Sequence, residues 1–129
     1  MSAITPALRF RHERYETVGS TNDLARAAAL RGEPEGLWVL AGRQTAGRGR
    51  HGRNWESPLG NFFGSLLLRP RRPPRDLASL SLVTALAVAE AVDRLSLGTL
   101  RAGVKWPNDV LLDGAKLAGI LLESGTTEL

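Results

Sequence analysis

The order of apolar and polar residues in the first part of the chain predicts a strand followed by a helix. Residues 8–15 alternate between apolar and charged side chains, which is the pattern of a strand with one buried face. Ser20 and Asp23 then have the S-x-x-D spacing of a helix capping box, and an Ala- and Leu-rich run follows to residue 31. Gly32 stands where the glycine that ends a helix is expected. We therefore expect a strand over 8–15 and a capped helix over 20–31.

Further apolar segments extend the pattern as far as residue 95. Residues 37–41 form a short apolar run, and residues 62–68 form a second one that is stopped by prolines. The polar, Gly-rich stretch 42–60 between them is typical of a loop. Apolar residues then recur at three- and four-residue spacing over 76–95, and this spacing predicts one long helix. The positions that define its apolar stripe are Leu77, Leu80, Val83, Ala87, Ala91 and Leu95.

The pattern from residue 104 onward predicts strands joined by a tight turn. Residues 104–106 form a predicted strand that Pro107 ends. Residues 110–112 and 116–122 flank Asp113-Gly114, a pair typical of two-residue hairpin turns with positive φ. Hairpin strands with helices between them indicate the α+β class, and a chain of 129 residues fits one domain.

Composition narrows the classes of protein to which this chain can belong. It contains no cysteine, so disulfides, thiolate zinc sites and cysteine nucleophiles are excluded. No apolar run approaches the ~20 residues of a membrane span, and the N-terminus lacks the pattern of a secretory signal peptide. We therefore expect a cytoplasmic protein that has no membrane partner.

The charge distribution points to a polyanionic partner. The formal net charge is +4 and the isoelectric point is about 10.6, a balance that suits nucleic acid, phosphates or an acidic protein. Basic residues cluster over 9–14, 43–53 and 69–75. The first and third clusters are most simply explained as solvated surface, so the middle cluster carries the candidate chemistry.

The middle cluster lies in a loop in which glycine and arginine alternate. The order is Gly47-Arg48-Gly49-Arg50, followed after one residue by Gly52-Arg53. Glycines let backbone N–H groups approach an anion closely, and arginines add forked, permanently charged donors, so the loop is suited to clamp a phosphate. No Gly-Lys-Ser/Thr sequence ends it, which excludes a Walker A loop. A flexible basic surface loop and an Arg/Gly segment that binds RNA stay open as alternatives.

Two further segments carry polar side chains suited to a ligand. Ser20-Thr21-Asn22 lies at the start of the first predicted helix. The trio is either a simple N-cap or a set of donors and acceptors for a neutral polar head group such as a ureido ring. Lys105 points away from the face of its strand that Val104 and Trp106 share. A lysine on a face that lines a cleft needs an anion as its partner, whereas a lysine on an open surface does not.

The residues that follow Lys105 add candidate ligands for a metal. Asn108 and Asp109 come at a strand end, where their oxygens could hold Mg²⁺. Lys116, on the return strand of the hairpin, is spaced to lie near Lys105. A Pro-Asn-Asp turn and an exposed lysine beside a turn are the alternatives at these positions.

Four segments occur in a characteristic order along the chain. They are Ser20-Thr21-Asn22, Gln44-Thr45-Ala46-Gly47-Arg48-Gly49-Arg50-x-Gly52-Arg53-x-Trp55, Lys105-Trp106-Pro107-Asn108-Asp109 and Lys116-Leu117-Ala118-Gly119-Ile120-Leu121. In this order and approximate spacing they resemble the biotin protein ligase family over residues 15–123. The resemblance implies a mixed, largely antiparallel sheet with helices packed on one face, as in class II aminoacyl-tRNA synthetases and biotin/lipoate ligases. It also implies that biotin and ATP form biotinyl-5′-AMP and pyrophosphate, and that biotin then passes to a lysine of a biotin carboxyl carrier protein domain.

The resemblance further implies a role for each matching position. Biotin would be held by Ser20, Thr21, Asn22, Gln44, Arg48, Gly49, Arg50 and Lys105. The nucleotide would be held by Gly47, Arg50, Arg53, Trp55, Asn108 and Lys116. The catalytic residues would be Lys105, Arg48, Lys116 and Asp109, and Asp109 would also hold Mg²⁺. Carboxylate attack on an α-phosphate brings two anions together, so cationic side chains and a metal ion suit this reaction.

The chain departs from the family pattern at both ends. No helix-turn-helix domain precedes the first predicted strand, so we expect no DNA partner. The sequence ends at Leu129, so residues 1–129 would be the N-terminal part of the catalytic domain, without the family's C-terminal β-barrel. A truncated fragment that binds biotin without turnover and an enzyme like the lipoate ligases are the alternatives to a biotin ligase.

Overall fold

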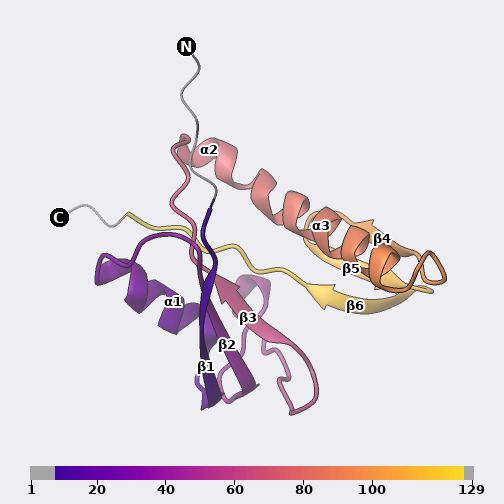
Figure 1. Cartoon of the computed structure of the whole chain (residues 1–129), viewed down its shortest axis with the longest axis horizontal. Helices are drawn as coiled ribbons and strands as arrows, with labels where there is room; N and C mark the ends of the chain where they lie inside the picture. Colours follow the sequence, from indigo (N-terminus) through magenta and orange to yellow (C-terminus); the bar gives the residue numbers. More distant parts are fainter. Residues whose placement is uncertain (1–7, 127–129) are drawn as a thin grey trace. The chain divides into compact units, whose positions relative to one another are not determined.

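The computed structural model describes residues 8–126, and the contacts within it divide the chain into two compact units. The N-terminal unit comprises the described residues up to Pro70 together with residues 125–126, and the C-terminal unit comprises Arg71–Ser124. Each unit contains one three-stranded sheet (Figure 1). The predicted α+β class, with mixed and antiparallel strands, is confirmed, and the strands are distributed over two sheets.

The N-terminal unit is a parallel strand–helix–strand arrangement extended by one antiparallel strand. β1 (Arg11–Val18) leads into α1 (Thr21–Leu30), and β2 (Leu37–Gln44) returns parallel to β1. β3 (Phe63–Leu66) pairs with β2 in the antiparallel sense, so the sheet order is β1-β2-β3. Between β2 and β3 the chain forms a loop that contains η1 (Arg50–Gly52), a single 3₁₀ turn.

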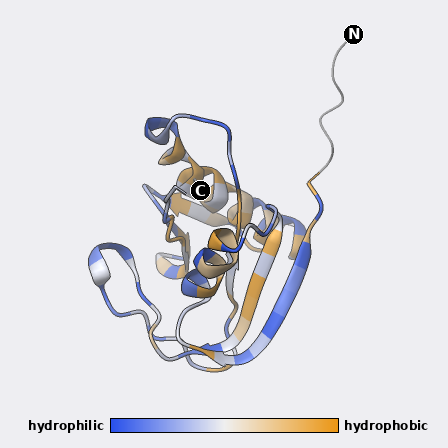
Figure 2. Cartoon of the chain, turned by 90° about the vertical axis from the view of Figure 1, so that its left-hand side faces the viewer, coloured by the Kyte–Doolittle hydropathy of each residue, from blue (hydrophilic) through white to orange (hydrophobic). Residues whose placement is uncertain are grey.

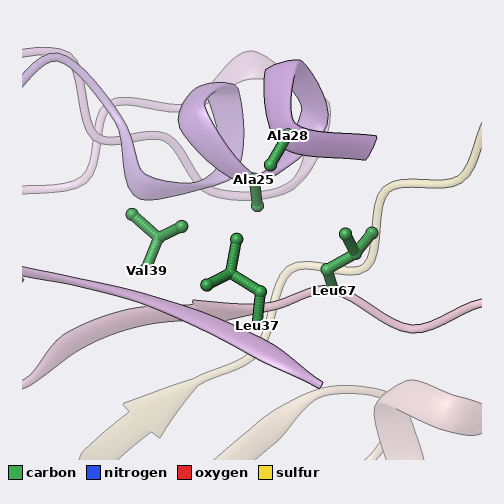
Figure 3. Packing of buried hydrophobic residues seen from close by; sticks show 5 residues of the cluster. All are labelled: Ala25, Ala28, Leu37, Val39 and Leu67. Carbon is green, nitrogen blue, oxygen red and sulfur yellow. The ribbon is translucent and has the colours of Figure 1, made fainter. Parts of the chain in front are cut away.

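The core of the N-terminal unit lies between α1 and one face of its sheet. Leu37 and Val39, alternate residues of β2, are buried and pack with Ala25, Ala28 and Leu67 (Figure 3). Alanines on the helix side let the backbone of α1 come close to the sheet, and the branched side chains opposite fill the layer. β1 lies at the edge of this sheet, and Figure 2 shows it as mostly hydrophilic beside the more hydrophobic β2. A charged edge strand discourages pairing with a second chain.

α1 ends at a glycine in the left-handed region, as the sequence predicts. Gly32 has a φ of +86°. The N–H groups of Gly32 and Glu33 donate to the carbonyl oxygens of Ala29 and Ala28, at 3.1 and 3.0 Å. This closure satisfies the last carbonyl groups of the helix, and a side chain at position 32 would be strained at that φ.

Two arginines hold the turn that joins α1 to β2. Nη2 of Arg69 donates to the carbonyl oxygens of Ala29 and Glu33, at 2.9 and 2.7 Å. Arg11 donates to the carbonyl oxygen of Pro34 at 2.7 Å and pairs with the Glu33 carboxylate at 3.1 Å. Both arginines belong to the basic clusters for which the sequence favoured solvated surface; Arg69 is half-buried and makes specific contacts instead, whereas Arg11 stays partly solvated beside its contacts.

The C-terminal unit packs one long helix against an antiparallel sheet. α2 (Pro74–Leu77) is a single turn and is followed by α3 (Ser79–Leu95). β4 (Ala102–Lys105), β5 (Asp109–Leu112) and β6 (Ala115–Gly119) pair in that order, and α3 contacts β4 and β5 (Figure 1). Within residues 8–126, no helix is long and apolar enough to cross a membrane.

Most predicted elements are present, with shifted ends. Asp113 and Gly114 join β5 to β6 at φ values of +51° and +79°, which confirms the predicted turn with two positive φ angles. β2 extends to Gln44, into the stretch predicted as loop, and β1 begins and ends three residues later than predicted. The helix predicted over 76–95 is divided into α2 and α3.

The buried face of α3 differs from the predicted stripe. Val83 and Leu95, two members of that stripe, are 56% and 87% exposed. The side chains that are buried or half-buried instead include Leu82, Ala85, Val88, Ala89 and Val92. The first part of α3 is apolar on nearly every side, so three- and four-residue spacing fits more than one face. The buried face is centred on Ala85, whose small side chain permits close packing.

We predict that replacing Arg69 with alanine lowers the free energy of unfolding by about 1–3 kcal/mol, because carbonyl groups at the end of α1 lose their charged donor. Urea unfolding followed by circular dichroism measures the change. Arg72→Ala is the matched control, because Arg72 is exposed and a surface substitution shifts stability by less than about 0.5 kcal/mol. Equal effects of the two substitutions would contradict a stabilising role for the Arg69 contacts.

Candidate functional site

Residues predicted to hold a polar head group meet where β2 ends and α1 begins. Ser20 and Thr21 are buried, each 4% exposed. The Thr21 N–H donates to Oε1 of Gln44 at 2.8 Å, and the Thr21 hydroxyl donates to the same oxygen at 3.2 Å. No carbonyl within a helix reaches the N–H groups of its first turn, so they need other acceptors. The Gln44 side chain therefore caps α1 from the end of the neighbouring strand.

The predicted capping box at Ser20 is not formed. Ser20 occupies the N-cap position but makes no side-chain capping bond. Its Oγ instead accepts a hydrogen bond from Nη1 of Arg48 at 3.2 Å, and Nη2 of Arg48 pairs with the Asp23 carboxylate at 2.8 Å. The forked guanidinium engages both residues of the S-x-x-D pair, which explains why they do not serve the helix backbone.

Two buried serines join Thr21, Asn22 and Gln44 into one polar network. Ser65, on β3, contacts the Thr21 hydroxyl at 2.7 Å and makes a short hydrogen bond to Oδ1 of Asn22. Ser57 accepts a hydrogen bond from Nε2 of Gln44 at 3.1 Å. The described part of the chain contains no buried side-chain polar atom without a hydrogen-bond partner. A buried, satisfied and largely uncharged network of this kind suits a neutral polar group rather than an anion.

The Gly/Arg loop is folded back on itself. Arg48 and Asn54 form an isolated β-bridge, and the Gly49 N–H donates to the Arg53 carbonyl oxygen at 2.7 Å. The Trp55 N–H closes the base of the loop on the carbonyl oxygen of Gly47 at 3.0 Å. The structure thus brings Arg48 to the head-group residues and leaves Arg50 and Arg53 exposed.

Gly47 is required by close packing rather than by an unusual backbone conformation. A Cβ atom at Gly47 would lie 2.5 Å from Oγ of Ser57, 2.8 Å from the Trp55 carbonyl oxygen and 2.9 Å from Nε2 of Gln44. At Gly49 the closest atoms would be 3.8–3.9 Å away, which is ordinary contact. The two glycines of the motif therefore have different structural requirements.

A second group of predicted residues lies on the sheet of the C-terminal unit. Lys105 of β4 is the direct cross-strand partner of Asp109 of β5, so their side chains share one face. Nζ of Lys116, on β6, pairs with Oδ1 of Asp109 at 3.0 Å. Lys105 and Lys116 thus both neighbour Asp109, which lies on the strand between theirs.

A β-bulge places Lys116 on this face. β5 and β6 pair Val110 with Ala118, and the register then shifts so that Leu111 pairs with Lys116. Side chains alternate between the faces of a sheet, so Leu111 shares the face of Asp109, and Lys116 opposite it shares that face too. Without the shift, Lys116 would lie on the face of the fully buried Val110.

Asn108 has a structural contact in addition to its predicted role. Its side-chain Nδ2 donates to the Ile120 carbonyl oxygen at 2.7 Å, and its backbone carbonyl oxygen accepts from the Ile120 N–H at 2.9 Å. These bonds hold the chain after β6 against the start of β5. Trp106, by contrast, is 76% exposed.

A pocket of about 300 Å³ lies elsewhere on the N-terminal unit. It is lined by Arg14, Tyr15, Leu40, Ala41, Gly42, Phe62 and Phe63. The hydrogen bond from the Tyr15 hydroxyl to Glu13, at 2.8 Å, raises the pKa of that hydroxyl above its usual range, with desolvation as a further cause. None of the predicted site residues lines this pocket, so it does not help to locate the candidate site.

Comparison with known proteins identifies the family. Residues 15–128 match the biotin/lipoate A/B protein ligase family model. The chain belongs to this family. The match confirms the resemblance that the four sequence segments suggested.

Individual relatives narrow the likeness to biotin protein ligases. The chain is 52% identical over 106 residues to the biotin–[acetyl-CoA-carboxylase] ligase of Paracoccus denitrificans, a match that covers 79% of this chain and 44% of that protein. It is 39% identical over 115 residues to the bifunctional ligase/repressor BirA of Bacillus subtilis, covering 88% and 35%. The biotin protein ligase from Aquifex aeolicus in complex with biotin and ATP is similar in structure, with a TM-score of 0.77, 34% identity, and 90% and 47% coverage. The chain spans less than half the length of each of these three proteins.

In this member of the biotin/lipoate ligase family, the sequence-predicted site residues form two groups, one in each unit. Three further residues contact them and were not assigned a ligand role from the sequence: Asp23, Ser57 and Ser65. The sequence marks Asp23 only as part of the S-x-x-D capping pattern, and that spacing gives no sign of its ion pair with Arg48. The two serines carry no sequence signal, since their contacts to Gln44 and Thr21 come from other elements.

The Gly47 packing predicts a contrast between two alanine substitutions. Gly47→Ala should destabilise the N-terminal unit by about 1–3 kcal/mol, because the new Cβ atom must displace Ser57 or Gln44. Gly49→Ala, the matched control in the same loop, should change stability by less than about 1 kcal/mol. Urea unfolding of both variants makes the comparison, and equal destabilisation would reject the steric role of Gly47.

Proposed function

We propose that this chain uses ATP to activate biotin as biotinyl-5′-AMP and then transfers the biotin to a lysine of a biotin carboxyl carrier protein domain. The observation that carries the proposal is the uncharged hydrogen-bonded cluster of the buried Thr21 and Ser57 with the half-buried Gln44. The similarity to proteins named as biotin ligases supports the proposal. The similar structure from Aquifex aeolicus, a complex with biotin and ATP, supports it as well. The absence of cysteine agrees with a reducing cytoplasm as the place of the reaction.

The head-group cluster matches the hydrogen-bonding character of a ureido ring. Such a ring is neutral and offers two N–H donors and one carbonyl acceptor. The Thr21 hydroxyl bonds to Gln44, and the Ser20 hydroxyl to Arg48, and a ring of this kind could engage these side chains in exchange. Leaving a buried polar group without a partner is costly, so this cluster would bind a ureido ring in strong preference to a ligand that lacks its donors and acceptor.

The C-terminal unit carries the charges that the first chemical step needs. In that step a biotin carboxylate oxygen bonds to the α-phosphorus of ATP, and the bond from that phosphorus to the pyrophosphate oxygen breaks. Two anions must come together, so the cationic side chains of Lys105 and Lys116 would neutralise the developing charge. In the second step the amine of a carrier lysine attacks the biotinyl carbonyl carbon, AMP leaves, and the amine loses its proton to water.

Mg²⁺ would be held mainly by the substrate. No cluster of three or more histidine, aspartate or glutamate side chains occurs among residues 8–126. Asp109 is one carboxylate that already pairs with Lys116, and Mg²⁺ is commonly bound through one or two carboxylates together with phosphate oxygens and water. The residues therefore fit an ion that Asp109 shares with ATP, where it would neutralise phosphate charge.

A second candidate function is biotin binding without turnover. The residues predicted to hold the head group all lie in the N-terminal unit, so they could hold biotin without the charged residues of the C-terminal unit. Titration calorimetry with biotin, followed by a pyrophosphate-release assay with biotin and MgATP, separates the two. Pyrophosphate release that depends on biotin supports the ligase, binding without release supports the second candidate, and no binding by a folded sample rejects both.

We predict that Lys105→Ala reduces the rate of biotin-dependent pyrophosphate release by about 100-fold, because the attacking and leaving oxygens lose a positioned cation. The side chain is exposed, so thermal unfolding should change little. Arg101→Ala removes an exposed cation just before the same strand and should leave the rate within about twofold. An unchanged rate in Lys105→Ala would remove Lys105 from the mechanism.

A further inference from the structure

Ser57 is a buried polar residue that the proposed reaction does not use. It is 5% exposed and belongs to the N-terminal unit, between the Gly/Arg loop and β3. Its Oγ donates to the carbonyl oxygen of Trp55 at 3.0 Å and accepts from Nε2 of Gln44 at 3.1 Å. The Ser57 hydroxyl therefore links the Gln44 amide to the main chain at Trp55.

The two ends of the Gln44 amide meet groups with fixed hydrogen-bonding character. The Trp55 carbonyl oxygen can only accept, so it takes the single hydrogen of the Ser57 hydroxyl, and Oγ of Ser57 then faces Gln44 as an acceptor. An acceptor there requires the NH₂ group of the amide. At the other end the Thr21 backbone N–H can only donate, and it requires the amide oxygen.

Both ends thus require the same orientation of the Gln44 amide. In the flipped orientation, two N–H donors would meet at Thr21, and the Ser57 hydroxyl could reach the amide oxygen only by giving up its hydrogen bond to the Trp55 carbonyl oxygen. The flip would therefore lose the hydrogen bond at Thr21 and one of the two hydrogen bonds at Ser57, and unsatisfied polar groups in a partly buried site are costly. Thr21 alone would fix one end of the amide, and Ser57 fixes the other.

We propose that Ser57 is a positioning residue that fixes the orientation of the Gln44 amide, and through it the pattern of donors and acceptors offered to the head group. The part of this inference that concerns the ligand rests on the proposed function, whereas the orientation itself does not. Ser57 acts through Gln44 and needs no contact with a substrate.

The Ser57 hydroxyl group can be removed without breaking the main-chain contact between Ser57 and Gln44. The Gln44 N–H also donates to the Ser57 carbonyl oxygen, at 3.3 Å, so the two residues are tied by their main chains as well. Gly47 packs against the same hydroxyl, because its missing Cβ leaves the space that Oγ of Ser57 occupies. Ser57→Ala therefore removes the orienting acceptor while the main-chain bond between the residues stays.

The test compares Ser57→Ala, Gln44→Ala and the double variant in the full chain. Hydrogen exchange of the Thr21 amide, followed by NMR, reports the Gln44 orientation without any ligand. Ser57→Ala should accelerate that exchange by about fivefold or more, and should weaken biotin binding in titration calorimetry by about tenfold. In the Gln44→Ala background, Ser57→Ala should change either quantity by less than about twofold, because two residues that act as one unit are not additive.

Thr45→Ala is the matched control. Thr45 is exposed, lies next to Gln44, and its hydroxyl makes one long contact, at 3.4 Å, to the Val18 carbonyl oxygen. Its removal should leave Thr21 exchange and biotin affinity within about twofold of the parent chain.

The outcomes separate this inference from the proposed function. Unchanged Thr21 exchange in Ser57→Ala overturns the positioning role, whatever the biotin affinity. Equal losses of biotin affinity from Ser57→Ala with and without Gln44 also overturn it, because Ser57 would then act independently of Gln44. If the parent chain binds no biotin but Ser57→Ala accelerates Thr21 exchange, the proposed function fails and the positioning role is supported.

Discussion

The hydrogen bond from the Thr21 N–H to the Gln44 side chain is the constraint on which the N-terminal unit depends. A helix cannot satisfy the N–H groups of its own first turn, and α1 begins without a side-chain bond from Ser20. β2 must continue as far as Gln44 for the amide to reach Thr21. The same extension of β2 frees the Ser20 hydroxyl for Arg48. One side chain thus sets the end of a strand, the start of a helix and the place of the head-group residues.

The two units carry two kinds of chemistry, and their burial follows from that difference. Ser20 and Thr21 are buried and hydrogen-bonded, which suits the discrimination of a neutral ligand because every missing partner is costly there. Lys105, Asp109 and Lys116 lie on a more accessible sheet face. Charged groups kept near water avoid a large desolvation penalty, yet they can still neutralise a bound phosphate.

Sequence reasoning succeeded where the determining contacts are local. The glycine that ends α1 and the Asp113-Gly114 turn were predicted because positive φ strongly selects particular residues. It failed for the buried face of α3, where apolar residues on most sides fit several faces, and for the end of β2, which a residue on another element determines. Ser57 and Ser65 could not be identified, since serine is common and their contacts to Gln44 and Thr21 come from other elements. The family could be identified because the order of its motif segments along the chain is distinctive.

The Gly/Arg loop is where the structure changes the sequence interpretation most. The alternation of glycine and arginine predicts a phosphate clamp in which glycines open the backbone to the anion and arginines add charged donors. In the structure Gly47 also makes room for the contact between Ser57 and Gln44, and its neighbour Arg48 contacts Ser20 and Asp23. A guanidinium at the start of α1 lies near the positive end of the helix dipole, and the Asp23 carboxylate offsets that repulsion. Adjacent residues of one motif therefore stabilise two separate parts of the head-group site, and Arg50 and Arg53 carry the exposed positive charge that an anion could approach.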